Sequence, residues 1–137
     1  MVIVVDASVA LGWLFTNQSS KLTHAALDHA TDLGAIVPAH FSFEIGMVLR
    51  ARERLRGLSR HELNEMVADL QALNMTVDNA HPVGLIGVIA ALSCQQSIKY
   101  ADAGYLELAI RRNLPLATRD AALANAAKAV GVNLFAA

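Results

Sequence analysis

The stretch Val2-Ile3-Val4-Val5-Asp6-Ala7-Ser8 decides the predicted fold. Its apolar residues favour β structure, and no polar residue alternates with them, which predicts a strand buried on both faces of a parallel sheet. Ligands of such sheets bind at the carboxyl ends of the strands. Asp6 lies at that end, so we take its carboxylate as the first residue of a candidate active site.

The composition predicts one compact domain over residues 1–137. The chain is 55% hydrophobic and has only 3 prolines, and no stretch reads as a linker or a tail, so it can build a substantial core. Its formal net charge is −1, which argues against broad electrostatic binding to nucleic acid. Any contact with nucleic acid is therefore expected to be local.

The hydropathy pattern indicates neither a membrane span nor a secretion signal. Mean hydropathy is +0.41, but the longest uncharged apolar stretch, residues 83–94, is far shorter than the roughly 20 residues of a span. It predicts a buried helix instead. No basic region precedes the first strand, and Asp6 interrupts it, which argues against a signal peptide. The single cysteine, Cys94, cannot form an intramolecular disulfide, and we expect a cytoplasmic protein.

Short strands and helices are predicted to alternate along the chain. Two of the expected strands, residues 2–5 and 114–118, end next to acidic residues. Parallel neighbours need crossover connections, so the pattern predicts an α/β fold: a parallel sheet of about four to five strands with helices on both faces, in three layers. The remaining strands are expected at residues 35–38, 75–77 and 132–135, and the helices at residues 9–15, 20–33, 40–56, 59–73, 83–97, 102–113 and 121–130.

Several polar residues stand where helices are predicted to begin. Ser8 is a candidate N-cap of the first helix. Ser59 and Glu62, three residues apart, form a capping-box pattern. Asp102 and Asp120 each precede an apolar helical segment, as ordinary N-caps do.

Four carboxylates are candidates for one shared site: Asp6, Glu44, Asp102 and Asp120. Asp6 and Asp120 each follow a predicted strand, so both are expected at the same edge of the sheet. Glu44 lies on the apolar stripe of its helix, and Asp102 begins a helix that could pack toward this edge. Taken singly, each has a simpler interpretation. Glu44 could face solvent or pair with an arginine or His40, and the aspartates could be turn or capping residues.

Bringing the four carboxylates together requires a cation. At about 5 Å and an effective dielectric near 20, each like-charged pair repels by roughly 3 kcal/mol. Oxygen ligands without a cysteine or paired histidines point to Mg²⁺ or Mn²⁺ rather than zinc. The hydroxyls of Ser8 and Thr118 would orient the carboxylates or a metal-bound water.

Segments around these acids together resemble the PIN domain family and, more narrowly, the VapC-type ribonuclease toxins of prokaryotic toxin–antitoxin pairs. The resemblance covers the whole chain, including its length and the order of the acids. The segments are Asp6-Ala7-Ser8 after the first strand, Glu44 in an apolar-then-basic helix, Asp102-Ala103-Gly104-Tyr105-Leu106-Glu107-Leu108-Ala109, and Leu114-Pro115-Leu116-Ala117-Thr118-Arg119-Asp120.

The sequence departs from this family at two places. Many relatives place tyrosine directly before the third acid, whereas here Ala101 separates Tyr100 from Asp102. Relatives also often carry an acid after the Trp-Leu-Phe segment, where this chain has residues 16–18, Thr-Asn-Gln. The first departure concerns the start of the helix, and the second removes an accessory acid.

The resemblance implies an Mg²⁺- or Mn²⁺-dependent endoribonuclease that cuts single-stranded or loop RNA, the toxin component of a type II toxin–antitoxin system. It implies a cognate antitoxin protein over an apolar groove, and a homodimer. A bound ion would acidify the water that attacks phosphorus. The catalytic and metal-binding residues that it implies are Asp6, Glu44, Asp102 and Asp120.

Two groups of arginines are candidates for contacts with RNA phosphates. Arg111, Arg112 and Arg119 lie close in sequence to the proposed acids, and we favour them as phosphate contacts. The second group, at residues 50–60, forms the densest basic segment. For that group we favour a solvated helix face on which the arginines pair with neighbouring glutamates.

Two other functions fit parts of the pattern. A non-catalytic α/β interaction module would use excess apolar surface to bind a protein. A metal-dependent phosphatase-like hydrolase would also begin with a strand and an aspartate, but it would need a second aspartate where Ser8 stands.

The sequence also contains four aromatic residues that lie in apolar runs. They are expected in the core or in an interface rather than as base-stacking platforms: Trp13, Phe15, Phe41 and Phe43.

Overall fold

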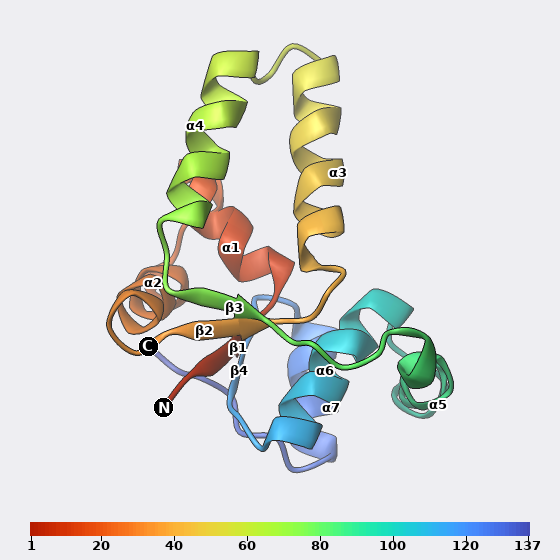
Figure 1. The fold of residues 1–137 in the computed structure, drawn as a ribbon. Coiled ribbons are helices and arrows are strands. Elements are labelled where there is room, and N and C mark those ends of the chain that lie inside the picture. Colours follow the sequence, from red (N-terminus) through yellow and green to blue (C-terminus); the bar gives the residue numbers. More distant parts are fainter.

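The computed structural model describes all of residues 1–137 and confirms the α/β fold (Figure 1). Strands and helices alternate as predicted, with two additional short 3-10 turns at Thr16–Gln18 and Val83–Leu85. In chain order the elements are β1 (Ile3–Val5), α1 (Ala7–Leu14), α2 (Lys21–Leu33), β2 (Ala35–Val37), α3 (Phe41–Arg54), α4 (Arg60–Gln71), β3 (Met75–Val77), α5 (Ile86–Gln96), α6 (Tyr100–Arg112), β4 (Leu116–Ala117) and α7 (Ala121–Ala129).

All strands belong to one four-stranded parallel sheet in the order β3-β2-β1-β4. The opening strand β1 is central, since Val4 pairs with Ile36 on one side and with Leu116 on the other. A fifth strand at residues 132–135 was predicted, but only Leu134 forms an isolated bridge, to Leu116. The end of the chain is thus held at the sheet edge without extending the sheet.

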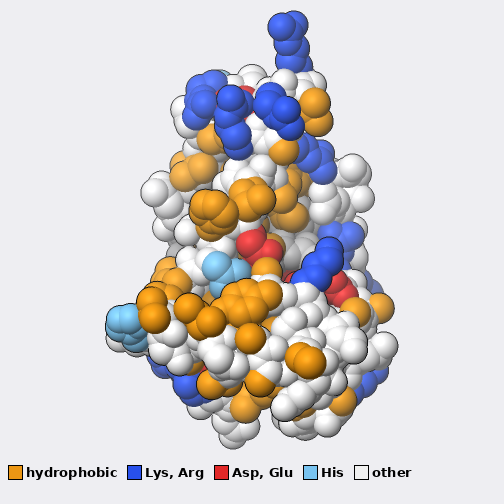
Figure 2. All heavy atoms as spheres, turned by 90° about the vertical axis from the view of Figure 1, so that its right-hand side faces the viewer, with side chains coloured by type: hydrophobic (Ala, Val, Ile, Leu, Met, Phe, Trp, Pro, Cys, Tyr) orange, Lys and Arg blue, Asp and Glu red, His pale blue; other side chains and the backbone are white.

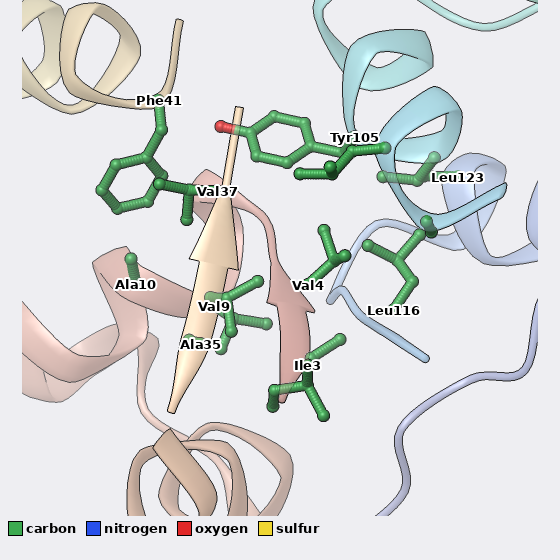
Figure 3. Packing of buried hydrophobic residues seen from close by; sticks show 14 of the residues in the cluster. Ile3, Val4, Val9, Ala10, Ala35, Val37, Phe41, Tyr105, Leu116 and Leu123 are labelled. Carbon is green, nitrogen blue, oxygen red and sulfur yellow. The ribbon is translucent and has the colours of Figure 1, made fainter. Parts of the chain in front are cut away.

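The core is built around β1. Ile3, Val4 and Val5 are each at most 1% exposed. In Figure 3, Val9 and Phe41 lie on one side of the strands, and side chains from α6 and α7 lie on the other. The residues of β1 are buried because helices cover both faces of the sheet, and this is why the segment shows no polar alternation.

The helix starts agree only partly with the sequence analysis. Ser59 and Glu62 form the expected capping box at α4. Ser8 was predicted as the N-cap of α1, but Asp6 caps it. Asp102 was predicted as an N-cap, but α6 begins earlier, at Tyr100, so that Asp102 lies in the first turn. The capping positions differ because α1 and α6 each begin two residues sooner than predicted.

Two helical regions lie at the edges of the molecule. The hairpin of α3 and α4 projects away from the sheet (Figure 1). The apolar segment predicted as a buried helix is instead α5, which lies on the outside, packs mainly on α6 and has Ile89 as its only buried residue. That prediction was wrong because a helix at the periphery is covered on one face only. None of the helices combines the length and the apolar character that a membrane span requires.

Candidate active site

Two of the four predicted acids stand where strands of the sheet end. Asp6 follows β1 and caps α1, and its Oδ1 atom accepts from the Val9 N–H at 3.1 Å. Asp120 follows β4 and caps α7, where its Oδ1 atom accepts from the N–H groups of Ala122 and Leu123 at 2.8 and 3.1 Å. Because β1 and β4 are parallel neighbours, both carboxylates lie at the same edge of the sheet.

The Asp6 carboxylate is held from both sides by hydroxyl groups. Ser8 Oγ donates to Asp6 Oδ1 at 2.6 Å, and Thr118 Oγ1 donates to Oδ2 at 2.5 Å. Each hydroxyl in turn accepts a backbone N–H from the segment after β4, that of Arg119 for Ser8 and that of Asp120 for Thr118, both at 3.0 Å. This network fixes the orientation of Asp6 and joins β1 to the segment after β4.

Burial raises the pKa of the Asp6 carboxyl, which is only 3% exposed. The hydrogen bonds from Ser8, Thr118 and the Val9 N–H act in the opposite direction, since they favour the carboxylate,. The charge of Asp102 adds a smaller upward contribution. The negative charge of Asp102 therefore disfavours ionisation of Asp6 across the site.

Glu44 is fixed by Tyr105, a residue to which the sequence analysis gave no role. The buried Tyr105 hydroxyl of α6 donates to Glu44 Oε1 at 2.6 Å. Burial and the Glu44 carboxylate raise the pKa of Tyr105 far above its usual range, so the phenol stays protonated and remains a donor. This bond connects the first turn of α3 to α6.

His40 lies against the same pair of residues. Its Nε2 atom is 2.9 Å from the Ala101 carbonyl oxygen and 3.6 Å from Glu44 Oε1. Its ring meets the Tyr105 ring edge to face, at 4.9 Å between centroids. A carbonyl oxygen only accepts, so Nε2 carries the hydrogen. A Cβ atom on Gly104 would overlap His40 Cε1, and glycine is therefore what lets α3 and α6 approach here.

Asp102 is the acid that the others influence most. Burial raises the pKa of its carboxyl, and repulsion from Asp120 and then from Glu44 raises it further, while Lys99 and His40 act in the opposite direction. No hydrogen bond contributes to this shift. Asp102 is thus a half-buried carboxylate among other acids, and it accepts no hydrogen bond from the protein.

The four predicted acids meet at one cavity of about 320 Å³. As the side chains stand, however, no group of three or more acidic, histidine or cysteine residues is close enough together to hold one ion. The single shared site predicted from the sequence is therefore not a closed cage. The lining residues are Asp6, Ala7, Ser8, Leu11, Glu44, Met47, Val48, Asp102, Tyr105 and Asp120.

The donor set nevertheless fits a hard divalent cation. Mg²⁺ usually keeps several waters and is held by one or two carboxylates together with substrate phosphates, rather than by a cage of protein ligands. The raised pKa of Asp102, caused in part by Asp120 and Glu44, is the electrostatic sign of an uncompensated acidic site. A cation between these carboxylates would remove the repulsion.

The arginines predicted to contact RNA have different surroundings. Arg111 donates from Nη1 and Nη2 to Asp78 at 3.2 and 2.5 Å, and from Nε to both oxygens of Glu107. Arg112 also donates to Asp78, at 2.9 Å. Arg119 is exposed, and its Nη1 atom donates to the Ser8 carbonyl oxygen and to Gln18. Only Arg119 is free of an ion pair.

Sequence reasoning missed the two residues that organise these contacts. Tyr105 appeared only within the segment that carries the family resemblance, because a tyrosine at helical spacing has the same pattern as a core residue. Asp78 was not considered at all, since its partner Arg111 is 33 positions away. The i, i+4 spacing of Glu107 and Arg111 was the one signal in the sequence of this network,.

Comparison with known proteins identifies the fold family. The family model of the PIN domain matches residues 3–129. The chain belongs to the PIN domain family. A solved structure, that of PAE2754 from Pyrobaculum aerophilum, is similar with a TM-score of 0.65 and 17% sequence identity, over 92% of this chain and 84% of that chain. The comparison with curated proteins gave no match.

The PIN domain is generally a metal-dependent nuclease fold, and this agrees with the acidic cavity. At 17% identity, the likeness to PAE2754 concerns the fold alone. For this PIN domain, the family match therefore supports a hydrolase of nucleic acid in general.

Proposed function

We propose that this PIN domain is an Mg²⁺- or Mn²⁺-dependent endoribonuclease that cuts single-stranded or loop RNA, and that it is the toxin component of a type II toxin–antitoxin system. The observation that supports this most is the cavity lined by Asp6, Glu44, Asp102 and Asp120, with the pKa of Asp102 raised partly by its acidic neighbours. Phosphodiesters are anions, so a substrate could approach these acids only with a cation between them.

The four acids are the residues that would hold the cation, each with a different degree of preorganisation. When bound, the ion would supply positive charge to the phosphate and acidify a water molecule. Ser8 and Thr118 keep the Asp6 carboxylate in one orientation. Tyr105 does the same for Glu44. Asp102 makes no such bond and is free to turn toward an ion.

Adding a divalent cation to the purified protein is expected to start RNA cleavage and to raise the melting temperature. At ten times its Kd, an ion that binds only the folded state stabilises it by about 1.4 kcal/mol, or about 5 °C for a domain of this size. Cleavage is measured on structured RNAs by gel, with EDTA as the control, and melting by calorimetry. RNA that stays intact with both Mn²⁺ and Mg²⁺ would contradict the proposed activity.

Replacing Tyr105 with phenylalanine is expected to weaken metal binding by about 10- to 100-fold, the range found when a partner of a metal-binding residue is removed. The cause is loss of the 2.6 Å bond that orients Glu44. Titration of Mn²⁺ by calorimetry measures the affinity. Tyr100→Phe is the matched control, because the same atom is removed from an exposed position of the same helix. Equal affinity in both variants would exclude a positioning role for Tyr105.

Protein partners are part of the same proposal. A cavity of about 600 Å³ lies beside the acids, lined by apolar residues that include Leu85, Ile89 and Tyr100. We propose that an antitoxin covers this cavity and that the protein forms a homodimer. An adjacent small reading frame encoding a DNA-binding antitoxin would support the toxin assignment over a housekeeping nuclease. Tight binding of a partner without any stabilisation by metal would favour an interaction module instead.

A further inference from the structure

The solvent face of α3 carries a stripe of four residues that begins beside the acidic cavity. Phe43, Met47, Arg50 and Arg54 are spaced by four, three and four residues, so they lie on one face of the helix,. All four are exposed, Phe43 by 72% and Met47 by 59%. We call these residues the α3 stripe. It is apolar next to the cavity and basic toward the α3–α4 hairpin tip.

The α3 stripe is continuous with the acidic cavity. Met47 lines that cavity and also a shallow groove on α3, whose lining includes the other three residues of the stripe. Phe43 and Met47 also line the larger cavity that we assign to the antitoxin, so an antitoxin there would compete with RNA on the stripe. In Figure 2, hydrophobic side chains lie between acidic side chains in the middle of the molecule and a basic group at its end. An extended polymer bound in the cavity can therefore continue along α3 without leaving the protein surface.

The charge distribution favours an anionic occupant at the far end of the stripe. Residues 50–62 contain five arginines and two glutamates, a net charge of +3, whereas the whole chain has −1. Arg50 and Arg60 share one glutamate, Glu53, and Arg54 has no ion-pair partner. The hairpin tip thus has positive charge that the protein does not neutralise, in contrast to Arg111 and Arg112 at the end of α6.

The Phe43 side chain is exposed on this face, so of the two places predicted for the aromatic residues, the core and an interface, the core is excluded for Phe43. Exposed aromatic side chains next to basic residues are the pattern by which proteins hold single-stranded nucleic acid, with bases stacked on the rings and phosphates near the cations. From Phe43 to Arg54 the helix rises about 16 Å. This is enough for four or five stacked nucleotides at about 3.4 Å each.

We infer that the α3 stripe binds single-stranded RNA, with a base on Phe43 and phosphates on Arg50 and Arg54, and guides the strand into the acidic cavity. This inference rests on the proposed ribonuclease function and adds the path of the substrate. It assigns the RNA contact to α3 rather than to Arg111 and Arg112, whose guanidinium groups are held by the buried Asp78. Arg50 also pairs with a glutamate, Glu53, but its side chain is 64% exposed.

Binding is tested with a fluorescein-labelled, unstructured 20-nucleotide RNA by anisotropy, in EDTA so that no cleavage occurs, between 50 and 200 mM salt. Each phosphate contact on a single strand contributes about 0.7 to the slope of log K against log salt, so Arg50→Gln/Arg54→Gln is expected to lower the slope by about 1.4. Phe43→Ala is expected to weaken binding by about 5- to 150-fold and leave the slope unchanged.

The controls remove two exposed cations and shorten one exposed apolar side chain elsewhere on the surface. Lys21→Gln/Lys128→Gln takes away two exposed cations on α2 and α7, and Leu33→Ala shortens an exposed apolar side chain at the end of α2. Both are expected to bind RNA like the wild type. An equal loss of affinity in the lysine variant, which would mean that net charge alone matters, overturns the inference.

Cleavage with Mn²⁺ is measured in parallel on the wild type and the α3 stripe variants, so that the two proposals can fail separately. If the wild type cleaves RNA and the variants bind and cleave equally well, the inference is wrong while the proposed function stands, and the stripe is then a face for a protein partner. If the wild type binds RNA through the stripe but does not cleave, only the proposed activity fails. A wild type that does not bind the RNA at 50 mM salt overturns the inference.

Discussion

Replacing Asp102 with asparagine is expected to lower metal-dependent RNA cleavage by at least about 100-fold. Charge stabilisation by a bound ion contributes several kcal/mol to such reactions, and each 1.36 kcal/mol corresponds to a factor of ten in rate. Asp102 influences the pKa of Asp6, and Asp120 and Glu44 influence that of Asp102. Loss of this charge therefore removes the electrostatic centre of the cavity.

The same substitution is expected to stabilise the metal-free protein at neutral pH. The pKa of Asp102 is raised above 3.8 in the folded state, first by burial and then by repulsion. The folded state thus holds this proton more tightly than the unfolded state, so stability falls as the pH rises through the interval between 3.8 and the raised pKa. Asparagine has no such penalty. The gain should be present at pH 7 and should disappear as the pH approaches the ordinary aspartate value.

Both effects can be measured on one pair of variants. RNA cleavage with Mn²⁺ gives the activity, and urea unfolding with EDTA at pH 7 and at pH 4 gives the free energy of unfolding. Asp32→Asn is the matched control, since it neutralises an exposed aspartate on α2. An Asp102→Asn protein that is as active as the control would contradict the catalytic role of Asp102. An Asp102→Asn protein that is less stable than the control at pH 7 would contradict the expected relief of repulsion.

The parts of the site that follow a strand could be predicted from the sequence. The unbroken apolar run of β1 reads as a strand buried on both faces, and the carboxyl ends of parallel strands share one edge of the sheet. This rule alone predicts that Asp6 and Asp120 lie together, and both line the same cavity. The rule needs only the edge of the sheet at which each strand ends, so it holds even though β4 (Leu116–Ala117) is shorter than the strand predicted over residues 114–118.

The parts that depend on where a helix begins were less predictable. The sequence allows either Asp102 or an earlier residue to start α6, and capping preferences favoured Asp102. In the structure α6 starts at Tyr100, two residues sooner, after the N-cap residue Lys99, whose side chain makes no capping bond. That shift matters for function, because a capping aspartate would be bound to backbone N–H groups, as Asp6 and Asp120 are. Capping preference alone therefore did not locate the start of α6.

Side-chain contacts between distant segments that the strand-end rule does not relate could not be read from the sequence. In the sequence, Arg111 and Arg112 stand at the basic end of a predicted helix, which suggests free cations near the acids. The structure instead joins Arg111 to Asp78, which directly follows β3, and to Glu107, one turn earlier. A free and an ion-paired arginine have the same sequence signature, and only the three-dimensional position of Asp78 distinguishes them.

Replacing Arg111 with methionine is therefore expected to destabilise the protein much more than it weakens RNA binding. Asp78 and Glu107 are 7% and 4% exposed, so the substitution leaves buried carboxylates with fewer partners. Breaking a fully buried ion pair costs about 3–5 kcal/mol. Since 35% of the Arg111 side chain is exposed and Arg112 still contacts Asp78, we expect a loss of about 1–3 kcal/mol, because water screens part of the interaction.

The pH dependence distinguishes this ion-pair effect from a simple packing loss. Hydrogen bonds from Arg111 and Arg112 hold the pKa of Asp78 below 3.8, so the stabilisation is present above that value and is lost as the pH falls through the lowered pKa,. The gap between wild type and Arg111→Met should thus be largest near pH 7 and narrow toward pH 3, whereas a packing loss would not change with pH. Arg60→Met is the control, since it breaks an ion pair to Glu53 that is exposed on the arginine side, and about 0–1 kcal/mol is expected there.

RNA affinity is measured well below the melting temperature of each variant. If Arg111→Met keeps its stability and loses affinity, Arg111 contacts the substrate after all, and the path along α3 would have to extend to the end of α6.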